Sequence, residues 1–429
     1  MAAQEQPGGT STATPAAFVA ASQVFNGIVA LFYLKIVESN VGPAGFGSVN
    51  AMIAAMFVLG SGLFQPFEQE MSRRVAERVA LGEGTGPQVR SAAAVFGGCV
   101  AVLLAIVVAL GPVVSARVFP GEPGVYGALL VGVVAFAGTH FARGVLAGAG
   151  RLPAYGIWFL IEGTVKIFAA LTLGMVGVTS SWAYALAAGM AALMAGVVAA
   201  VSAVAYFRGD GPEMDPAGVR STLGGLVASS LLLALLINGA PIAVKVLAGS
   251  ESKEAAARFI AGLVLVRAPL NLILTAQAVL LPRFSAQVVR CRFSELRHDL
   301  SRLGLALAAA TAAATAGATL LGPWAIQLLL GPEFVELKRI DFAVLAASSF
   351  VLIGAMVASQ ALIALGGFSK LWTGWAAGVI AMVVGCLMPI SLFHRVELGL
   401  MLSSVCSACV IAVHTQGALS TRERSGQTM

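Results

Sequence analysis

The chain has 429 residues, of which 58% are hydrophobic and 11% charged, and its formal net charge is +6. This composition excludes an ordinary water-soluble domain. The charge does not indicate nucleic-acid binding, because the basic residues lie in short segments between apolar runs, where they orient a chain in a bilayer. The sequence therefore predicts a membrane protein.

The apolar runs have the length that a membrane-spanning helix requires. A bilayer core about 30 Å thick needs roughly 20 residues per helix. After a polar, disordered tail of residues 1–14, twelve such runs begin near Ala16, Phe46, Ser91, Gly124, Leu152, Thr179, Ser221, Phe259, Leu303, Phe342, Leu371 and Leu398. We expect an all-α polytopic membrane protein of about twelve transmembrane helices, followed by a polar tail of residues 417–429.

The second half of the chain repeats features of the first half. The segment FYLKIV around Lys35 recurs as IAVKVL around Lys245. Between the halves lies the segment 208–220, whose Gly, Pro and acidic residues are typical of a polar linker. We expect an N-lobe over 15–207 and a C-lobe over 221–416, with six helices each. Repeats of six helices share one orientation, which predicts parallel repeats arranged as a V around a central cavity.

The basic residues are divided unequally between the two sides of the membrane. If the N-terminus is cytoplasmic, sixteen Lys and Arg lie on the inner side and eight on the outer side. This bias predicts a multi-pass protein of the plasma membrane with both termini in the cytoplasm. The longest inner connections, 65–84 and 283–302, follow the second and eighth spans and are predicted to be amphipathic.

Two glycine-rich segments carry a family resemblance. These are VGPAGFGSVNAM after the first span and QALIALGGFSKLWTGWAAG across the tenth and eleventh. With the twelve-helix plan, they resemble the polysaccharide-transporter branch of the multidrug/oligosaccharidyl-lipid/polysaccharide exporter superfamily, which includes O-antigen flippases. The resemblance implies a monomeric transporter without a cofactor. It also implies that the partners are a lipid-linked oligosaccharide, membrane lipids and polysaccharide-assembly enzymes.

Only two of the twelve predicted spans contain charged residues. The fifth contains Glu162 and Lys166, and the eighth contains Arg267. A charge at mid-membrane costs roughly 2.5–3.5 kcal/mol, so such residues are expected to face a cavity or a partner. Lys166 and Arg267 are candidate ligands for an anionic pyrophosphate. Alternatively, Glu162 and Lys166 form a structural pair at i and i+4, or Glu162 binds a coupling ion, and Arg267 serves helix packing.

Other basic residues lie at the ends of predicted spans. Lys35 and Lys245, at the outer ends of the first and seventh spans, either bind substrate or reach to the lipid head groups. Glu38 forms with Lys35 either a gate between the lobes or a local surface pair. Arg143, at the inner end of the fourth span, either receives substrate phosphate or follows the positive-inside bias.

Polar residues within the spans point to a portal but not to catalysis. Asn26 in the first span and Asn238 in the seventh either line the portal or hydrogen-bond between helices. The four histidines are scattered along the chain, so we predict no catalytic residues, no metal site and no cofactor.

The sequence leads to one functional hypothesis and two alternatives. The first is a non-enzymatic flippase that moves polyprenyl-pyrophosphate-linked oligosaccharide from the inner to the outer leaflet by alternating access, for cell-surface polysaccharide export. The second is a cation-coupled exporter of drugs or small molecules on the same fold. The weakest is an integral-membrane glycosyltransferase or polymerase, which typically shows clustered carboxylates or a large polar outer loop.

Overall fold

The computed structural model describes residues 13–119, 122–208, 210–211, 216–247, 263, 266–267, 278–330 and 337–426. Within these ranges every regular element is a helix. The first half comprises α1 (Ala13–Leu59), the π-helix η1 (Gly60–Phe64), α2 (Gln65–Leu81), α3 (Gly86–Ala109), α4 (Gly111–Val118), α5 (Pro123–Gly148), α6 (Leu152–Met175), α7 (Ser181–Ala203) and α8 (Ala205–Arg208). The second comprises α9 (Pro216–Leu247), the helix Ala278–Val289, α11 (Phe293–Leu330), α12 (Arg339–Ala364), α13 (Phe368–Cys386) and α14 (Leu392–Gly426).

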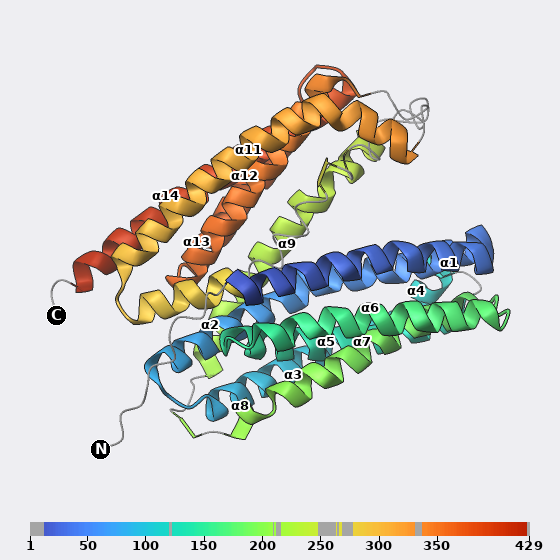
Figure 1. The fold of residues 1–429 in the computed structure, drawn as a ribbon, viewed down its shortest axis with the longest axis horizontal. Coiled ribbons are helices and arrows are strands. Elements are labelled where there is room, and N and C mark those ends of the chain that lie inside the picture. Colours follow the sequence, from blue (N-terminus) through green and yellow to red (C-terminus); the bar gives the residue numbers. More distant parts are fainter. Residues whose placement is uncertain are drawn as a thin grey trace.

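The described residues form two hydrophobic cores rather than one. The first core draws its residues from Val19 to Ala203, with Ala278 added, and the second from Leu226 to Leu419. The two bundles lie close together at the end that carries α2 and diverge towards the opposite end (Figure 1). The start of α1 and the end of α14 lie at the end where the bundles approach each other. The predicted all-helical, V-shaped, two-lobe architecture is confirmed.

Nine of the described helices are long and apolar enough to cross a membrane. The three other predicted spans are the second, seventh and eighth. The second is the continuation of α1 beyond Gly42, where a φ of 72° breaks the helix after the first span. The seventh lies in α9, whose apolar stretch Gly224–Ile237 is shorter. Most of the eighth, which was predicted to begin near Phe259, lies outside the described residues.

The connection 65–84, which is predicted to be amphipathic, packs into the protein. Most of it forms α2, which buries Glu68, Glu70, Met71 and Ser72 within the protein. Its partner is α5, where Gly144 and Gly148 form a GxxxG pattern on one face. A Cβ added to Gly144 would lie 2.6 Å from the carbonyl oxygen of Glu68, and one added to Gly148 would lie 2.5 Å from that of Ser72. Glycine thus lets two backbones approach closely.

We predict that Gly144→Val separates α2 from α5 and destabilises the N-lobe. Overpacking a close helix contact costs about 1–3 kcal/mol, so the unfolding temperature of the detergent-solubilised protein is expected to fall by about 5 °C. The matched control is Gly138→Val on the same helix, where an added Cβ meets no atom within 4 Å. Equal unfolding temperatures for the two variants would contradict the close-approach role of Gly144.

Candidate functional site

A buried ionic network joins three helices of the N-lobe. Glu68 from α2 accepts a hydrogen bond from the Tyr155 hydroxyl of α6 at 2.7 Å, and its other oxygen lies 2.7 Å from His140 Nδ1 of α5. Arg143, one turn after His140, donates to Glu68 Oε1 at 3.2 Å and also contacts the Tyr155 hydroxyl. Glu68 and Arg143 are only 8% and 9% exposed. The close approach at Gly144 is what brings the Glu68 backbone within reach of α5.

Three aromatic rings of α6 surround the Arg143 guanidinium. Its central carbon lies 4.6 Å from the ring centroid of Tyr155, 4.8 Å from that of Trp158 and 4.9 Å from that of Phe159. Such cation–π contacts are strongest where water is excluded. The structure therefore places Arg143 in the interior of the N-lobe, neutralised by Glu68.

A second charge pair lies further along α6. Lys166 Nζ is 2.5 Å from Glu162 Oε1, so the i and i+4 ion pair is formed, and the two side chains are 12% and 7% exposed. The other carboxylate oxygen, Oε2, is buried without a hydrogen-bond partner. Glu162 also interacts electrostatically with Arg143. Both charge pairs thus lie in the interior of the N-lobe.

Asn26 is a polar residue at a helix interface. It comes from α1, and a Cβ added to Gly163 of α6 would lie 2.9 Å from its amide oxygen. That oxygen is buried and accepts no hydrogen bond. Asn26 therefore packs against Gly163, inside the interface between α1 and α6.

The lobes contact each other through η1, α2 and α9. A Cβ added to Gly62 of η1 would lie 3.0 Å from Cδ2 of Leu231 in α9. Arg73 of α2 lies over the ring of Phe368 at the start of α13, at 5.0 Å, and Arg290 Nε donates to the carbonyl oxygen of Ala80 at 3.3 Å. We call this set the inter-lobe contact. It adjoins the ionic network, because the π-helix η1 passes His140, whose Nε2 would be 3.3 Å from a Cβ on Gly60.

Arg267 is a buried cation of the C-lobe. Its guanidinium donates to the carbonyl oxygens of Ile237 at 2.7 Å and Leu236 at 3.3 Å, both in α9. Proline at position 241 explains this contact, since Pro has no N–H with which to bond the carbonyl four residues earlier. Arg267 is 9% exposed and its Nε has no partner. Within the part of the chain that is described, no carboxylate pairs with it.

The remaining predicted residues do not join these groups. Lys35 and Glu38 form an ion pair at 2.9 Å with side chains 74% and 50% exposed, which corresponds to the surface-pair interpretation. The side chains of Lys245 and Asn238 lie outside the described residues.

Glu68 and Tyr155 are not among the residues that the sequence predicted for the site. Glu68 lies in a connection between predicted spans, and Gly60, Gly62 and Pro66 before it are residues that often interrupt helices. Pro is nevertheless tolerated in the first turn of a helix. In the structure, η1 passes directly into α2 without leaving the protein. No local sequence pattern indicated a role for Tyr155, because its partner Glu68 lies 87 residues away.

Comparison with curated proteins finds relatives without a known function. No family model matches the chain. It is similar to the uncharacterized protein Rv1510 of Mycobacterium tuberculosis, with 26% identity over 395 residues that cover 89% of this chain and 85% of the relative. It is also similar to the uncharacterized protein Rv3630 of that species, with 25% identity over 407 residues that cover 92% and 89%.

Solved structures of transporters match nearly the whole chain. An outward-facing multidrug resistance MATE family transporter of the MOP superfamily has a TM-score of 0.75 at 14% identity, covering 97% of both chains. The Vibrio cholerae MATE transporter VcmN in the bent form has a TM-score of 0.76 at 13% identity, covering 96% and 99%. A MOP superfamily transporter from Pyrococcus furiosus has a TM-score of 0.72 at 13% identity, covering 98% of both. The chain thus has the MATE transporter fold; the polysaccharide branch stays a prediction.

Proposed function

We propose that this chain is an alternating-access transporter of the plasma membrane, and that its cargo is a lipid-linked saccharide bearing a pyrophosphate. The observation that carries the first part is the fold, which matches that of an outward-facing transporter over 97% of the chain. The arrangement of the lobes supports it too, because they meet at the inter-lobe contact and diverge away from it (Figure 1). Separating that contact while closing the opposite end is the rigid-body motion that alternating access requires.

Arg267 supports an anionic cargo. The two pairs in the N-lobe, Glu68 with Arg143 and Glu162 with Lys166, bring no net charge to the interior. Arg267 adds a buried positive charge whose hydrogen bonds within the described residues go to backbone carbonyls alone. A guanidinium has five N–H donors in a fork that matches phosphate oxygens. The donors that remain can therefore bind a pyrophosphate.

The position of Arg267 relative to the lobes also supports this role. It bonds to α9 at Leu236 and Ile237, and α9 contacts η1 of the other lobe at Leu231. Five residues along a helix correspond to about 7.5 Å, so Arg267 is bound close to where the lobes meet. The Pyrococcus furiosus transporter of this fold is described as having a binding pocket of reversed polarity that suggests a different function. Pocket polarity is thus a reasonable guide to the class of cargo.

A cation-coupled exporter of small molecules is the second candidate, and Glu162 favours it. One of its carboxylate oxygens is buried without a hydrogen-bond partner. Such an oxygen can take up a proton or a sodium ion when Lys166 moves away. An exporter of cationic drugs would use the same carboxylate to bind its cargo.

The test compares leaflets in the native cells. After depletion of the protein, lipid-linked oligosaccharide is expected to accumulate in the inner leaflet, and wild-type protein is expected to restore its transfer. Arg267→Gln is expected to lower the transfer rate at least about tenfold, because a charge-assisted hydrogen bond is worth about 1.5–3 kcal/mol. The matched control is Lys35→Gln, which removes an exposed charge. If depletion leaves the distribution of lipid-linked oligosaccharide between the leaflets unchanged but abolishes export of cationic dyes, the second candidate is favoured instead.

Arg267 has a structural role that the experiment must separate from cargo binding. Pro241→Ala supplies the missing N–H to the Ile237 carbonyl. The double variant Arg267→Gln with Pro241→Ala is therefore expected to regain the wild-type unfolding temperature and to remain defective in transfer. Recovery of both properties would assign Arg267 to helix packing alone.

A further inference from the structure

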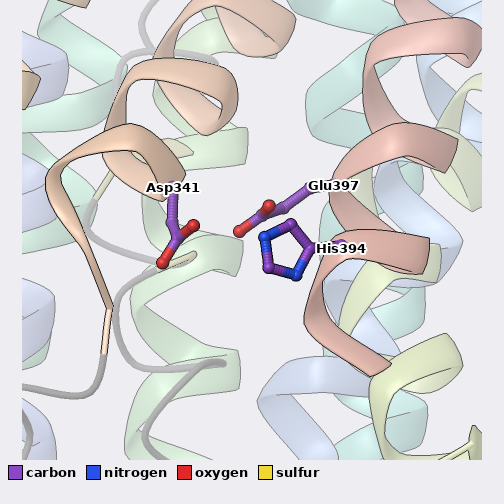
Figure 2. Close-up of side chains that lie close together, drawn as sticks. All are labelled: Asp341, His394 and Glu397. Atoms are coloured by element: carbon purple, nitrogen blue, oxygen red, sulfur yellow. The ribbon is translucent and has the colours of Figure 1, made fainter. Parts of the chain in front are cut away.

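Three potential metal ligands meet where α12 and α14 begin. Asp341 lies in the first turn of α12, and His394 and Glu397 lie in the first two turns of α14. The ligand atoms of the three side chains all lie within 4.8 Å of one another. Figure 2 shows the two carboxylates directed towards each other with the imidazole ring beside Glu397. In the predicted topology this end of both helices faces the outer side of the membrane.

Each of the two carboxylates has a buried oxygen that the protein does not satisfy. Asp341 Oδ2 accepts a hydrogen bond from the backbone N–H of Lys338 at 2.6 Å, while its Oδ1 is buried without a partner. Glu397 is 4% exposed, and its Oε1 is also buried without a partner. A buried carboxylate oxygen without a hydrogen bond or counter-ion is costly. These oxygens therefore need a ligand, and the carboxylate groups that carry them face each other in Figure 2.

No basic side chain of the described residues neutralises this pair. Lys338 and Arg339 are adjacent in sequence but exposed. Arg395 donates through its Nε to the backbone oxygen of Ile390 at 2.6 Å. Two neighbouring carboxylates repel each other when both are ionised. A cation between them removes this repulsion and satisfies both free oxygens.

The histidine determines which class of cation fits. His394 Nδ1 lies 2.5 Å from the hydroxyl of Ser391, so its Nε2 is the ring nitrogen left for a ligand. A hydrogen bond at the other nitrogen of a metal-binding imidazole is the usual way to orient it. Mg²⁺ and Ca²⁺ prefer all-oxygen sites, whereas one imidazole with two carboxylates suits Zn²⁺ and related divalent transition metals. His394 is exposed and provides a route for the ion.

We propose that Asp341, His394 and Glu397 form a site for a divalent transition metal such as Zn²⁺, which ties the start of α12 to the start of α14. Three protein ligands leave one coordination position open to water or to an outer-side ligand. Ligand atoms about 2 Å from a tetrahedral ion are roughly 3.3 Å apart. The side chains must therefore move closer together on binding, and the exposed His394 is free to do so. The site is independent of the cargo proposed above.

The experiment uses the full-length protein, purified in detergent and stripped with a chelator. Zn²⁺ titration is followed by calorimetry and by the unfolding temperature. One equivalent is expected to bind and to raise the unfolding temperature. His394→Gln and Glu397→Gln are each expected to weaken binding at least about tenfold. The matched control His414→Gln changes another histidine of α14, which contacts Thr373, and is expected to bind like wild type.

Several outcomes would overturn the site. These are absence of Zn²⁺ binding by the wild-type protein, binding that both glutamine variants retain, and Ca²⁺ or Mg²⁺ binding in preference to Zn²⁺. His394→Gln keeps the test decisive even if Glu397→Gln does not fold, because His394 is exposed. If the wild-type protein binds no metal and Glu397→Gln unfolds at a higher temperature than the wild type, the two carboxylates share a proton. The metal site is then excluded.

Discussion

Replacing Glu68 with alanine is expected to destabilise the protein by about 3–5 kcal/mol, the usual cost of breaking a buried ion pair from one side. The variant leaves the Arg143 guanidinium buried within the N-lobe without its counter-ion, and it removes the acceptor for Tyr155 and the partner of His140. The measurement is the unfolding temperature of the purified protein in detergent. Arg143→Ala is expected to have an effect of similar size, because it leaves Glu68 buried.

A double variant measures how strongly the charges of Glu68 and Arg143 depend on each other for stability. Glu68→Gln with Arg143→Met removes both charges, and it is expected to be more stable than either single charge-removing variant, because no uncompensated ion remains. The control is the exposed pair Lys35 and Glu38, whose alanine variants are expected to change stability by no more than about 0.5 kcal/mol. Additive effects at Glu68 and Arg143 would contradict a coupled network.

Cross-linking the inter-lobe contact is expected to abolish transport, because alternating access requires that contact to separate. We suggest Gly62→Cys with Leu231→Cys in a variant whose five native cysteines are replaced. A Cβ on Gly62 lies 3.0 Å from the end of the Leu231 side chain, so a short bifunctional thiol reagent spans the two residues. Transfer between leaflets is expected to fall at least about tenfold and to return after reduction of the link.

The matched control links two helices of the same lobe. Asn40 of α1 and Gly174 of α6 lie as close together, with 3.2 Å from the Asn40 amide nitrogen to a Cβ on Gly174. The pair Asn40→Cys with Gly174→Cys is expected to cross-link without loss of transport, since each lobe moves as a unit. Undiminished transport with a complete Gly62–Leu231 link would exclude a motion that separates the lobes at this contact.

Local sequence patterns were sufficient for one part of the site. The pair of Glu162 and Lys166 follows from their i and i+4 spacing, because residues at that spacing share a helical face whatever the tertiary structure. The i and i+3 pair of Lys35 and Glu38 follows in the same way, and the structure confirms both as ion pairs. The role of Arg267 required more than spacing, because the carbonyl it caps is released by a proline 26 residues earlier.

Contacts between distant segments left no local signal. Glu68 is 72 residues from His140 and 87 from Tyr155, and nothing in their own segments indicates that α2 turns inwards. Asp341 lies in a different helix from His394 and Glu397. The sequence alone therefore did not bring these three metal ligands together. Such groups meet only where helices pack against each other. That packing depends on the shapes of both helix surfaces, for example on the glycines of α5 that let α2 approach.

By itself, the sequence determined the all-helical class, the membrane location and the two-lobe plan of this protein. These follow from the length and repetition of apolar runs, because a backbone in lipid must satisfy its hydrogen bonds within each helix. Only the tertiary structure decided which charges are paired, where the lobes touch and which carboxylates lack a partner. Those properties depend on the relative placement of separate helices, whereas hydropathy measures each helix alone.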